Sequence, residues 1–371
     1  FMADVSAPYL ERIRSLNQYI RFTVNNFLEV EESRQQLALS IGMDLSRYRR
    51  EADKFLATLS RHQSDWDLLT AYREVFTSKS HFKPLKNLKG NLEWLMAHSL
   101  TILDTGRVER DDLAPLCYLH YLSTGWHHLT KFDHIVVDEA QDLNIMEFSV
   151  LKLLSGNGSF TIMGDMSQGI HAYRSIESWN MLKAEVFSTD RSVYREILYS
   201  YRSSREIVEL CNRVMPTGHS PAVPVYETGH RPTVEKIQPE PAAAAQLLKA
   251  LERFQQLGHR SMGVITRRET DSRELYRQLT PLLPTAGFDI QLVTDQSTGY
   301  RGGISLLPVS LAKGLEFDAV ILWDASAEQF QANDFDARLL YVALSRAMHG
   351  LHIFYRNHLT PLLSKKRNTS I

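Results

Sequence analysis

Residues 134–142 read His-Ile-Val-Val-Asp-Glu-Ala-Gln-Asp, which is a short apolar run that leads directly into two adjacent carboxylates. Ile135, Val136 and Val137 are consecutive and β-branched, a pattern typical of a central parallel strand that is covered on both faces. The carboxylates of Asp138 and Glu139 then fall at the carboxyl end of that strand, where open α/β sheets bind ligands. Such a pair can hold Mg²⁺, directly or through a water, and polarise an attacking water. The alternative is a strand followed by a solvated acidic turn.

The composition is that of an ordinary globular protein. The chain has 371 residues, of which 43% are hydrophobic and 23% are charged, and a formal net charge of −1. This length fits two or three domains, and the charge provides no global basic field for nucleic acid, so any such contact must be a local groove. Cys117 and Cys211 lie in unlike contexts, which argues against a disulfide framework or a zinc site and favours a reducing cytoplasm. We expect no membrane span and no signal peptide.

The first third of the chain is predicted to be helical. Apolar residues recur at three- and four-residue spacing from Tyr9 to about Phe76, and residues 91–103 and 111–122 predict two further helices. The lysine-rich stretch 78–90 is either a solvated charged loop or a segment that follows nucleic-acid phosphates.

After about residue 131, strand-like and helical runs alternate, which predicts βαβ units and a parallel sheet. The stretch 216–224 is rich in Pro, Gly and Ser and is the best candidate for a domain linker. The predicted strands are 135–137, 160–163, 195–198, 262–266, 304–309, 319–323 and 351–355, and the predicted helices are 145–154, 204–214, 269–279 and 339–348.

A second polar segment follows the strand at 160–163. It begins with Gly164 and Asp165 and continues to Gln168, and parallel topology brings Gln168 to the same sheet edge as the first acidic pair. An amide there can contact a terminal phosphate or its attacking water. The ring of Tyr173 and the guanidinium of Arg174 can touch a nucleic-acid strand by stacking and phosphate pairing.

Three later segments add further candidate residues. Tyr201 and Arg202 precede a serine-capped helix, where the ring can stack on a base and the guanidinium can reach a γ-phosphate. Residues 310–318, Ser-Leu-Ala-Lys-Gly-Leu-Glu-Phe-Asp, follow a strand. Residues 338–347 predict a helix whose Arg346 is suited to act as an arginine finger. Each signal alone has a bland alternative, because an arginine near a helix start is usually a surface residue.

Taken together and in this order, the motifs DEAQD, GDMSQ, SYRS, AKGLEFD and YVALSRA resemble the UvrD/Rep class of superfamily 1 helicases, from the Walker B motif onward. The resemblance covers roughly residues 132–355. It implies an α/β fold of RecA-like parallel-sheet domains, one partial and one complete, after an α-helical segment. The corresponding predicted domains are residues 1–131, 132–215 and 216–371. It also implies ATP and Mg²⁺ as cofactors and translocation on nucleic acid.

The resemblance carries roles over to particular residues. Asp138 becomes the magnesium ligand, and Glu139 becomes the catalytic base. The remaining assignments place residues around the γ-phosphate (Gln168, Arg202, Arg346), at the nucleotide (Asp165, Tyr201 on adenine, Glu316 near the ribose) and along the nucleic-acid track (Tyr173, Arg174).

The sequence departs from the family pattern at the phosphate-binding loop. No G-x-x-x-x-G-K-[ST] segment occurs in the 371 residues, and the Gly-Lys orders near residues 90 and 314 are reversed. In the family this loop precedes Walker B, so we expect it on a preceding segment, and we expect this chain alone to be inactive. An ATPase-dead protein-binding remnant is the alternative.

A second departure concerns the second RecA-like unit. Conventional family members insert a large extra domain there, and residues 203–309 leave little room for one. The compact unit and the helical lead-in resemble the HelD-like branch, whose members act on bacterial RNA polymerase and release it from nucleic acid. In that interpretation residues 1–131 belong to a helical insertion. A conventional 3′–5′ DNA helicase remains the rival interpretation.

Overall fold

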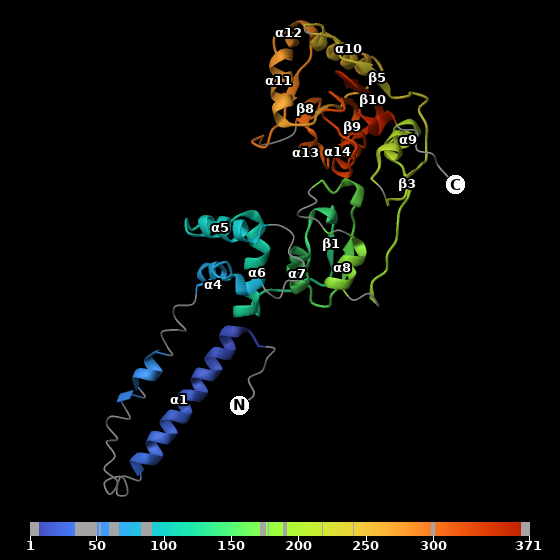
Figure 1. The fold of residues 1–371 in the computed structure, drawn as a ribbon. Helices are drawn as coiled ribbons and strands as arrows, with labels where there is room; N and C mark the ends of the chain where they lie inside the picture. The colour runs from blue at the N-terminus through green and yellow to red at the C-terminus, as the bar shows by residue number, and fades with distance from the viewer. Residues whose placement is uncertain are drawn as a thin grey trace. The chain divides into compact units, whose positions relative to one another are not determined.

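The computed structural model describes residues 7–33, 50–51, 53–58, 67–82, 91–170, 176, 178–187, 191–216, 218–239, 241–297 and 301–364. The chain divides into two compact units (Figure 1). Unit 1 comprises residues 1–136 and 144–161, and unit 2 comprises residues 137–143 and 162–371. The domain boundaries predicted at 131/132 and 215/216 stay predictions.

Unit 1 is helical, as the amphipathic spacing predicts. Its helices are α1 (Tyr9–Ser33), α4 (Leu68–Val75), α5 (Leu92–Leu103), α6 (Leu113–Thr124) and α7 (Ile145–Leu154), with short 3₁₀ turns η1 (Lys79–Phe82) and η2 (Arg110–Asp112). Asn91 caps α5 by accepting a hydrogen bond from Trp94 N, and Asn144 and Glu147 form a capping box on α7.

A small aromatic cluster joins α4, α5 and α6. Tyr72 and Phe76 pack edge to face, with ring centroids 5.3 Å apart, beside Leu103 and Leu116. The Tyr72 hydroxyl donates to Asp112 Oδ1 at 2.9 Å, and burial together with this carboxylate raises the pKa of the phenol. This contact ties α4 to the turn that begins α6.

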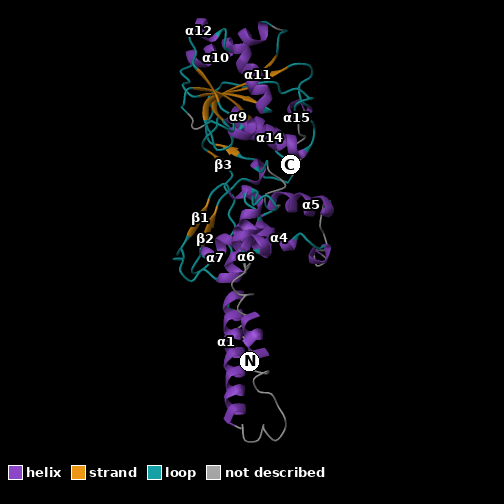
Figure 2. Ribbon diagram, turned by 90° about the vertical axis from the view of Figure 1, so that its left-hand side faces the viewer, coloured by secondary structure: helices purple, strands orange, loops and turns teal. Residues whose placement is uncertain are grey.

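Unit 2 is built around a six-stranded sheet in the order β5-β10-β9-β6-β8-β7, and every strand pair in it is parallel (Figure 2). Its strands are β5 (Thr233–Lys236), β6 (Met262–Thr266), β7 (Ile290–Leu292), β8 (Ile304–Pro308), β9 (Phe317–Leu322) and β10 (Ala347–Tyr355). Unit 2 also holds the pair β3 (Tyr199–Ser200) with β4 (Val223–Pro224), whereas the pair β1 (Ile135–Val137) with β2 (Phe160–Ile162) begins in unit 1 and ends in unit 2.

Helices cover both faces of the large sheet, which explains why β6 and β8 are buried along their whole length. Alternate strand residues enter different cores, because successive side chains on a strand point to opposite faces. Val264 packs with α10 and α11, whereas its neighbour Ile265 packs with α9 and α14. The helices of unit 2 are α8 (Trp179–Glu185), α9 (Arg205–Val214), α10 (Ala242–Gln256), α11 (Glu269–Leu279), α12 (Leu283–Ala286), α13 (Val309–Ala312), α14 (Asp334–Leu344) and α15 (Pro361–Ser364).

The mixed α/β fold class is confirmed, and most predicted elements lie where the sequence indicates. The strand predicted at 195–198 is wrong: these residues form no strand, β3 begins only at Tyr199, and Ile197 is 88% exposed, so its side chain covers no sheet. The helix predicted at 339–348 begins earlier and ends earlier, because Asn333 caps its start and β10 already begins at Ala347. Residues 216–224, the predicted linker, include β4, and both flanks belong to unit 2.

None of the helices in the described ranges combines the length and apolar character that a bilayer span requires.

Candidate active site

The acidic pair directly follows β1, as predicted. However, β1 pairs only with β2 among the described strands and Val136 is 60% exposed, so the strand is not covered on both faces as the sequence suggested. Asp138 is exposed, and its Oδ1 accepts a hydrogen bond of 2.8 Å from the backbone N of Glu139. Glu139 has φ 50°, in the left-handed region that a non-glycine residue rarely occupies. This backbone strain is found where a surrounding network fixes the residue, and it turns the carboxylate of Glu139 out of the strand direction.

Gln141 provides that network, although its side chain is fully buried. Its Nε2 donates to Oε2 of Glu139, and its Oε1 accepts a hydrogen bond of 3.0 Å from the backbone N of Asp165. Gly164 is required beside it, because a Cβ there would overlap Gln141 Oε1 and lie 3.1 Å from the backbone N of Ala140. The amide therefore connects the Glu139 carboxylate to the segment that follows β2.

Asp165 organises the turn η4 (Met166–Gln168). Its carboxylate accepts hydrogen bonds from the backbone N of Ser167 at 2.9 Å and from Nε2 of Gln168 at 2.8 Å. The hydroxyl of Tyr341, on α14, donates to the same carboxylate at 3.4 Å. Burial first, and then the charge of Asp165, raises the pKa of the Tyr341 phenol, which therefore stays a donor.

Arg346 completes the network from the turn between α14 and β10. Its guanidinium is buried, 1% exposed, and one NH2 donates to Oε1 of Gln168 at 2.8 Å. The remaining N–H groups donate to the carbonyls of Val342 and Leu315 at 3.1 and 3.2 Å. Burial first lowers the pKa of this guanidinium, and the nearby charge of Arg202 lowers it further. The charges of Glu139 and Glu316 oppose this effect, which locates both carboxylates within electrostatic range of Arg346.

Arg202 and Glu316 form an ion pair of 2.5 Å at the rim of this network, each side chain nearly half exposed. The two residues were predicted to contact different parts of a nucleotide, and in this structure they contact each other. Tyr201 is 73% exposed, so its ring is free to stack.

Lys313 links the network to the loop between β8 and β9. Its Nζ forms an ion pair of 2.6 Å with Asp142 and donates to the carbonyl of Gln168 at 3.0 Å. Only 10% of the Lys313 side chain is exposed, so the ammonium is held by these acceptors.

The residues at this site fit a magnesium–nucleotide ligand in their donor chemistry. Mg²⁺ prefers carboxylate oxygens, commonly one or two with several waters, and Asp138 offers an exposed carboxylate. Cationic N–H groups from Arg202 and Arg346 lie in electrostatic range of each other, as polyphosphate binding requires. Among the described residues no group of three or more His, Cys, Asp or Glu has the arrangement of a protein-only metal cage.

The structure thus brings most of the predicted site residues into one connected region of unit 2 (Glu139, Asp165, Gln168, Arg202, Glu316, Arg346). Asp138 adjoins Glu139, and Tyr201 adjoins Arg202. Tyr173 and Arg174 lie outside the described residues, and the individual roles stay predictions. Sequence reasoning missed Gln141, Lys313 and Tyr341. All three stand inside quoted motifs (DEAQD, AKGLEFD and YVALSRA), so a polar residue within each motif was the available signal.

Comparison with known protein families gives two matches along the chain. Residues 13–187 match the UvrD/REP helicase N-terminal domain, and residues 303–354 match the UvrD-like helicase C-terminal domain. The first match contains Glu139 and Gln168, and the second contains Glu316 and Arg346.

Similar proteins include several helicases. A putative ATP-dependent DNA helicase of Acanthamoeba polyphaga mimivirus is 24% identical over 81% of this chain and 47% of its own length. The ATP-dependent DNA helicase srs2 of Schizosaccharomyces pombe is 37% identical over 34% of this chain and 14% of its own length. The ATP-dependent DNA helicase PcrA of Staphylococcus epidermidis is 30% identical over 24% of this chain and 12% of its own length. The chain therefore spans about half the length of the mimivirus protein, and the other alignments are shorter.

Among solved structures, the C-terminal domain of a possible DNA helicase from Lactobacillus plantarum matches 46% of this chain and 95% of its own, with 27% identity and a TM-score of 0.38. The two family matches and the helicase relatives agree with the motifs that build the site. The chain carries UvrD/Rep-type superfamily 1 helicase domains.

Proposed function

We propose that this chain forms the hydrolytic site of an ATP-driven motor that acts on DNA. The observation that supports this most strongly is the continuous series of hydrogen bonds from Glu139 through Gln141, the backbone and carboxylate of Asp165, and Gln168 to Arg346. It connects a carboxylate suited to polarise water with a guanidinium suited to stabilise charge on phosphate. The helicase relatives support DNA as the substrate.

In such a site each of the chain's own residues would have a separate role. Bound Mg²⁺-nucleotide supplies the phosphoryl group and the Lewis acid. Asp138 would hold the metal, and Glu139 would accept a proton from the attacking water. Gln141 fixes the orientation of Glu139, since its amide contacts one carboxylate oxygen. Gln168 would orient the terminal phosphate, with Arg346 bonded to its amide oxygen.

Arg346→Ala tests the role of the guanidinium in a form of the protein that carries a phosphate-binding loop. Turnover of ATP should fall by about 10³–10⁵, the range for an arginine finger. Nucleotide binding, measured by titration of a fluorescent ATP analogue, should weaken far less. Arg277→Ala is the matched control, because Arg277 is exposed and pairs only at the surface with Glu274. If Arg346→Ala turned over ATP at the rate of the control, the assignment of a catalytic role to Arg346 would be wrong.

The finer part of the proposal concerns the partner. Residues 203–309 contribute the helices and strands of the large sheet and its cover, from α9 to β8. This favours a compact second unit without a large inserted domain, as in the HelD-like branch. We therefore propose bacterial RNA polymerase as the partner, with conventional strand separation as the rival activity.

A further inference from the structure

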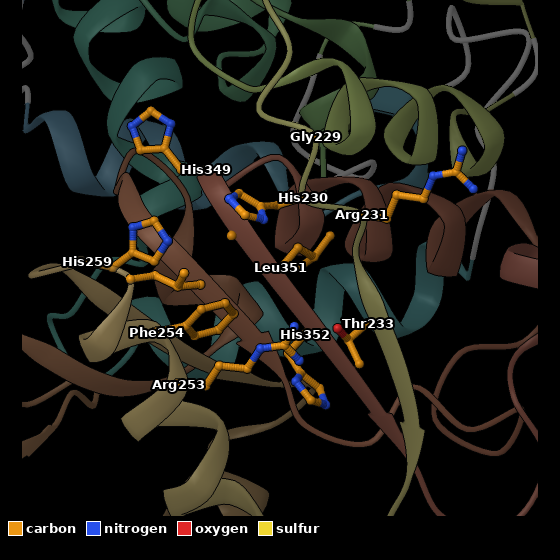
Figure 3. Close-up of a pocket in the computed structure, with 12 residues that line it drawn as sticks. Gly229, His230, Arg231, Thr233, Arg253, Phe254, His259, His349, Leu351 and His352 are labelled. Atoms are coloured by element: carbon orange, nitrogen blue, oxygen red, sulfur yellow. The ribbon is translucent and has the colours of Figure 1, made fainter.

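A pocket of about 210 Å³ lies in unit 2, apart from the network that joins Glu139 to Arg346 (Figure 3). Its walls come from the loop before β5, the C-terminal part of α10, the loop before β6 and the first half of β10. Among the described residues, two arginines and four histidines line the pocket, and none of the lining residues is acidic.

The lower end of the pocket carries two groups that can donate hydrogen bonds, the guanidinium of Arg253 and the hydroxyl of Thr233. Figure 3 shows the guanidinium of Arg253 extending towards His352, beside the hydroxyl of Thr233. Arg253 forms no ion pair with the described residues. Burial lowers the pKa of the His352 imidazole, the carboxylate of Glu235 opposes this effect, and the charge of Arg253 adds a smaller lowering. The floor is apolar: Phe254 packs closely over Gly350, where a Cβ would meet its ring at 2.7 Å.

His352 is a buried imidazole whose second nitrogen is not satisfied. The residue is 5% exposed, and its Nε2 has no hydrogen-bond partner among the described residues. The nearest carboxylate oxygen, Oε2 of Glu235, is 3.2 Å away but outside hydrogen-bonding geometry, and the other oxygen of Glu235 accepts from Gln246 Nε2. The Nε2 atom is covered, so its polar neighbour is the carboxylate of Glu235, and His352 contributes to the pocket mainly as a wall residue.

The upper end is formed by two imidazoles that stack. The rings of His259 and His349 lie 6.2 Å apart with an interplanar angle of 13°, and Tyr226 packs against His349. Burial lowers the pKa of His259, and the charge of His349 adds to this, while Asp318 opposes it. Asp318 is itself engaged by the backbone N–H groups of residues 260 and 261.

We propose that this pocket binds a phosphate group, with Arg253 as its main charged contact and Thr233 as a hydrogen-bonding partner. A tetrahedral oxyanion matches N–H and O–H donors on a pocket wall that has no acidic residue, and Glu235, the carboxylate beside His352, does not line that wall. The cluster does not have the arrangement of a metal site in the described residues. The phosphate belongs either to a nucleic-acid backbone or to a small phosphate compound, and the two sources share this chemistry.

Binding should tighten at lower pH. The imidazoles of His259 and His352 are held neutral by burial, and an anion favours their protonated forms. Protonation of the imidazoles therefore accompanies binding, and the affinity for a tetrahedral oxyanion of fixed charge, such as sulfate, rises as the pH falls from 7.5 to 6.0. Glu235 and Asp318 are the carboxylates packed nearest to these rings, and both are already engaged.

The test uses the 371-residue chain and titration with inorganic phosphate, followed by NMR signals of the histidine ring protons and by thermal shift. Arg253→Gln should weaken phosphate binding by about tenfold or more, because it removes a charge-assisted contact. Arg231→Gln is the matched control, because Figure 3 shows that Arg231 lines the same pocket but points away from the other side chains.

The proposal is overturned if both variants bind phosphate equally, or if phosphate fails to shift the ring signals of wild-type protein at pH 6.0. A single-stranded oligonucleotide then distinguishes the sources. Competition between the oligonucleotide and phosphate in wild type but not in Arg253→Gln assigns the site to a nucleic-acid backbone. Absence of competition assigns it to a small phosphate compound. The readout is binding, so it is independent of ATP hydrolysis.

Discussion

Gly164 and Gln141 determine how the acidic end of β1 is held. The amide of Gln141 reaches Glu139 on one side and the backbone of Asp165 on the other, in a fully buried position. Both contacts need the bare backbone of Gly164, because any side chain there would occupy the space of the Gln141 amide oxygen. A buried polar group is stabilising only while its partners remain in place.

Gly164→Ala should therefore destabilise unit 2. The added methyl group must displace the Gln141 amide, and overpacking of this kind costs about 1–3 kcal/mol. Urea unfolding measures the loss. Gly169→Ala is the matched control in the same loop, since the nearest atom to its Cβ, the carbonyl oxygen of Met166, would be 3.5 Å away. Equal stability of the two variants would show that Gln141 can move without cost.

The start of α14 is fixed by a buried ion pair. Arg267, just after β6, forms an ion pair of 2.6 Å with Asp336, and only 15% and 5% of their side chains are exposed. Asp336 also accepts from the backbone N of Gln331 at 2.7 Å and from Nδ2 of Asn333 at 3.1 Å. Because α14 carries Tyr341 and leads into Arg346, this anchor positions one side of the candidate active site.

Asp336→Ala should lower the free energy of unfolding by about 3–5 kcal/mol, because it leaves the Arg267 charge buried without its partner. Glu269→Ala provides the comparison, since the Glu269–Arg273 pair is more exposed and should contribute less than about 1 kcal/mol. Chemical denaturation of both variants measures the difference. A loss for Asp336→Ala no larger than for Glu269→Ala would mean that α14 is not anchored by this pair.

Local patterns in the sequence predict the elements that have strong hydrophobic and capping signals. The helix at 145–154 and the strand at 262–266 lie as predicted, because one has a capping box and the other is a fully buried apolar run. The stretch 195–198, Arg-Glu-Ile-Leu, has a single β-branched residue and forms no strand, because strand formation depends on a neighbouring strand that the local sequence does not encode.

The sequence predicts which residues belong to the candidate site better than it predicts which of them contact one another. Motif spacing identifies Gln168 and Arg346, and in the structure an NH2 of Arg346 donates to Oε1 of Gln168 at 2.8 Å. The pairing of Arg202 with Glu316 was not predictable, because it depends on tertiary packing between residues far apart in sequence. The same holds for Lys313 and Asp142.

At the scale of the whole molecule, the two proposed activities differ in what the protein acts on: RNA polymerase in one case and duplex DNA in the other. With a net charge of −1 we expect weak, salt-sensitive binding to single strands, with log K falling by about 0.7 per phosphate contact per log unit of salt. A loop-bearing form of the protein should release stalled RNA polymerase in the presence of ATP and unwind forked DNA poorly. Efficient unwinding without polymerase release would favour the conventional helicase.

The measurement that tests the central claim most directly is DNA-stimulated ATP turnover by a loop-bearing form of the protein and its Glu139→Gln variant. The amide keeps the shape of the carboxylate but cannot accept a proton, so turnover should be abolished while nucleotide binding is retained. Glu185→Gln, an exposed carboxylate on α8, should leave turnover unchanged. Turnover of Glu139→Gln at the parental rate would contradict the assignment of the hydrolytic site to the end of β1.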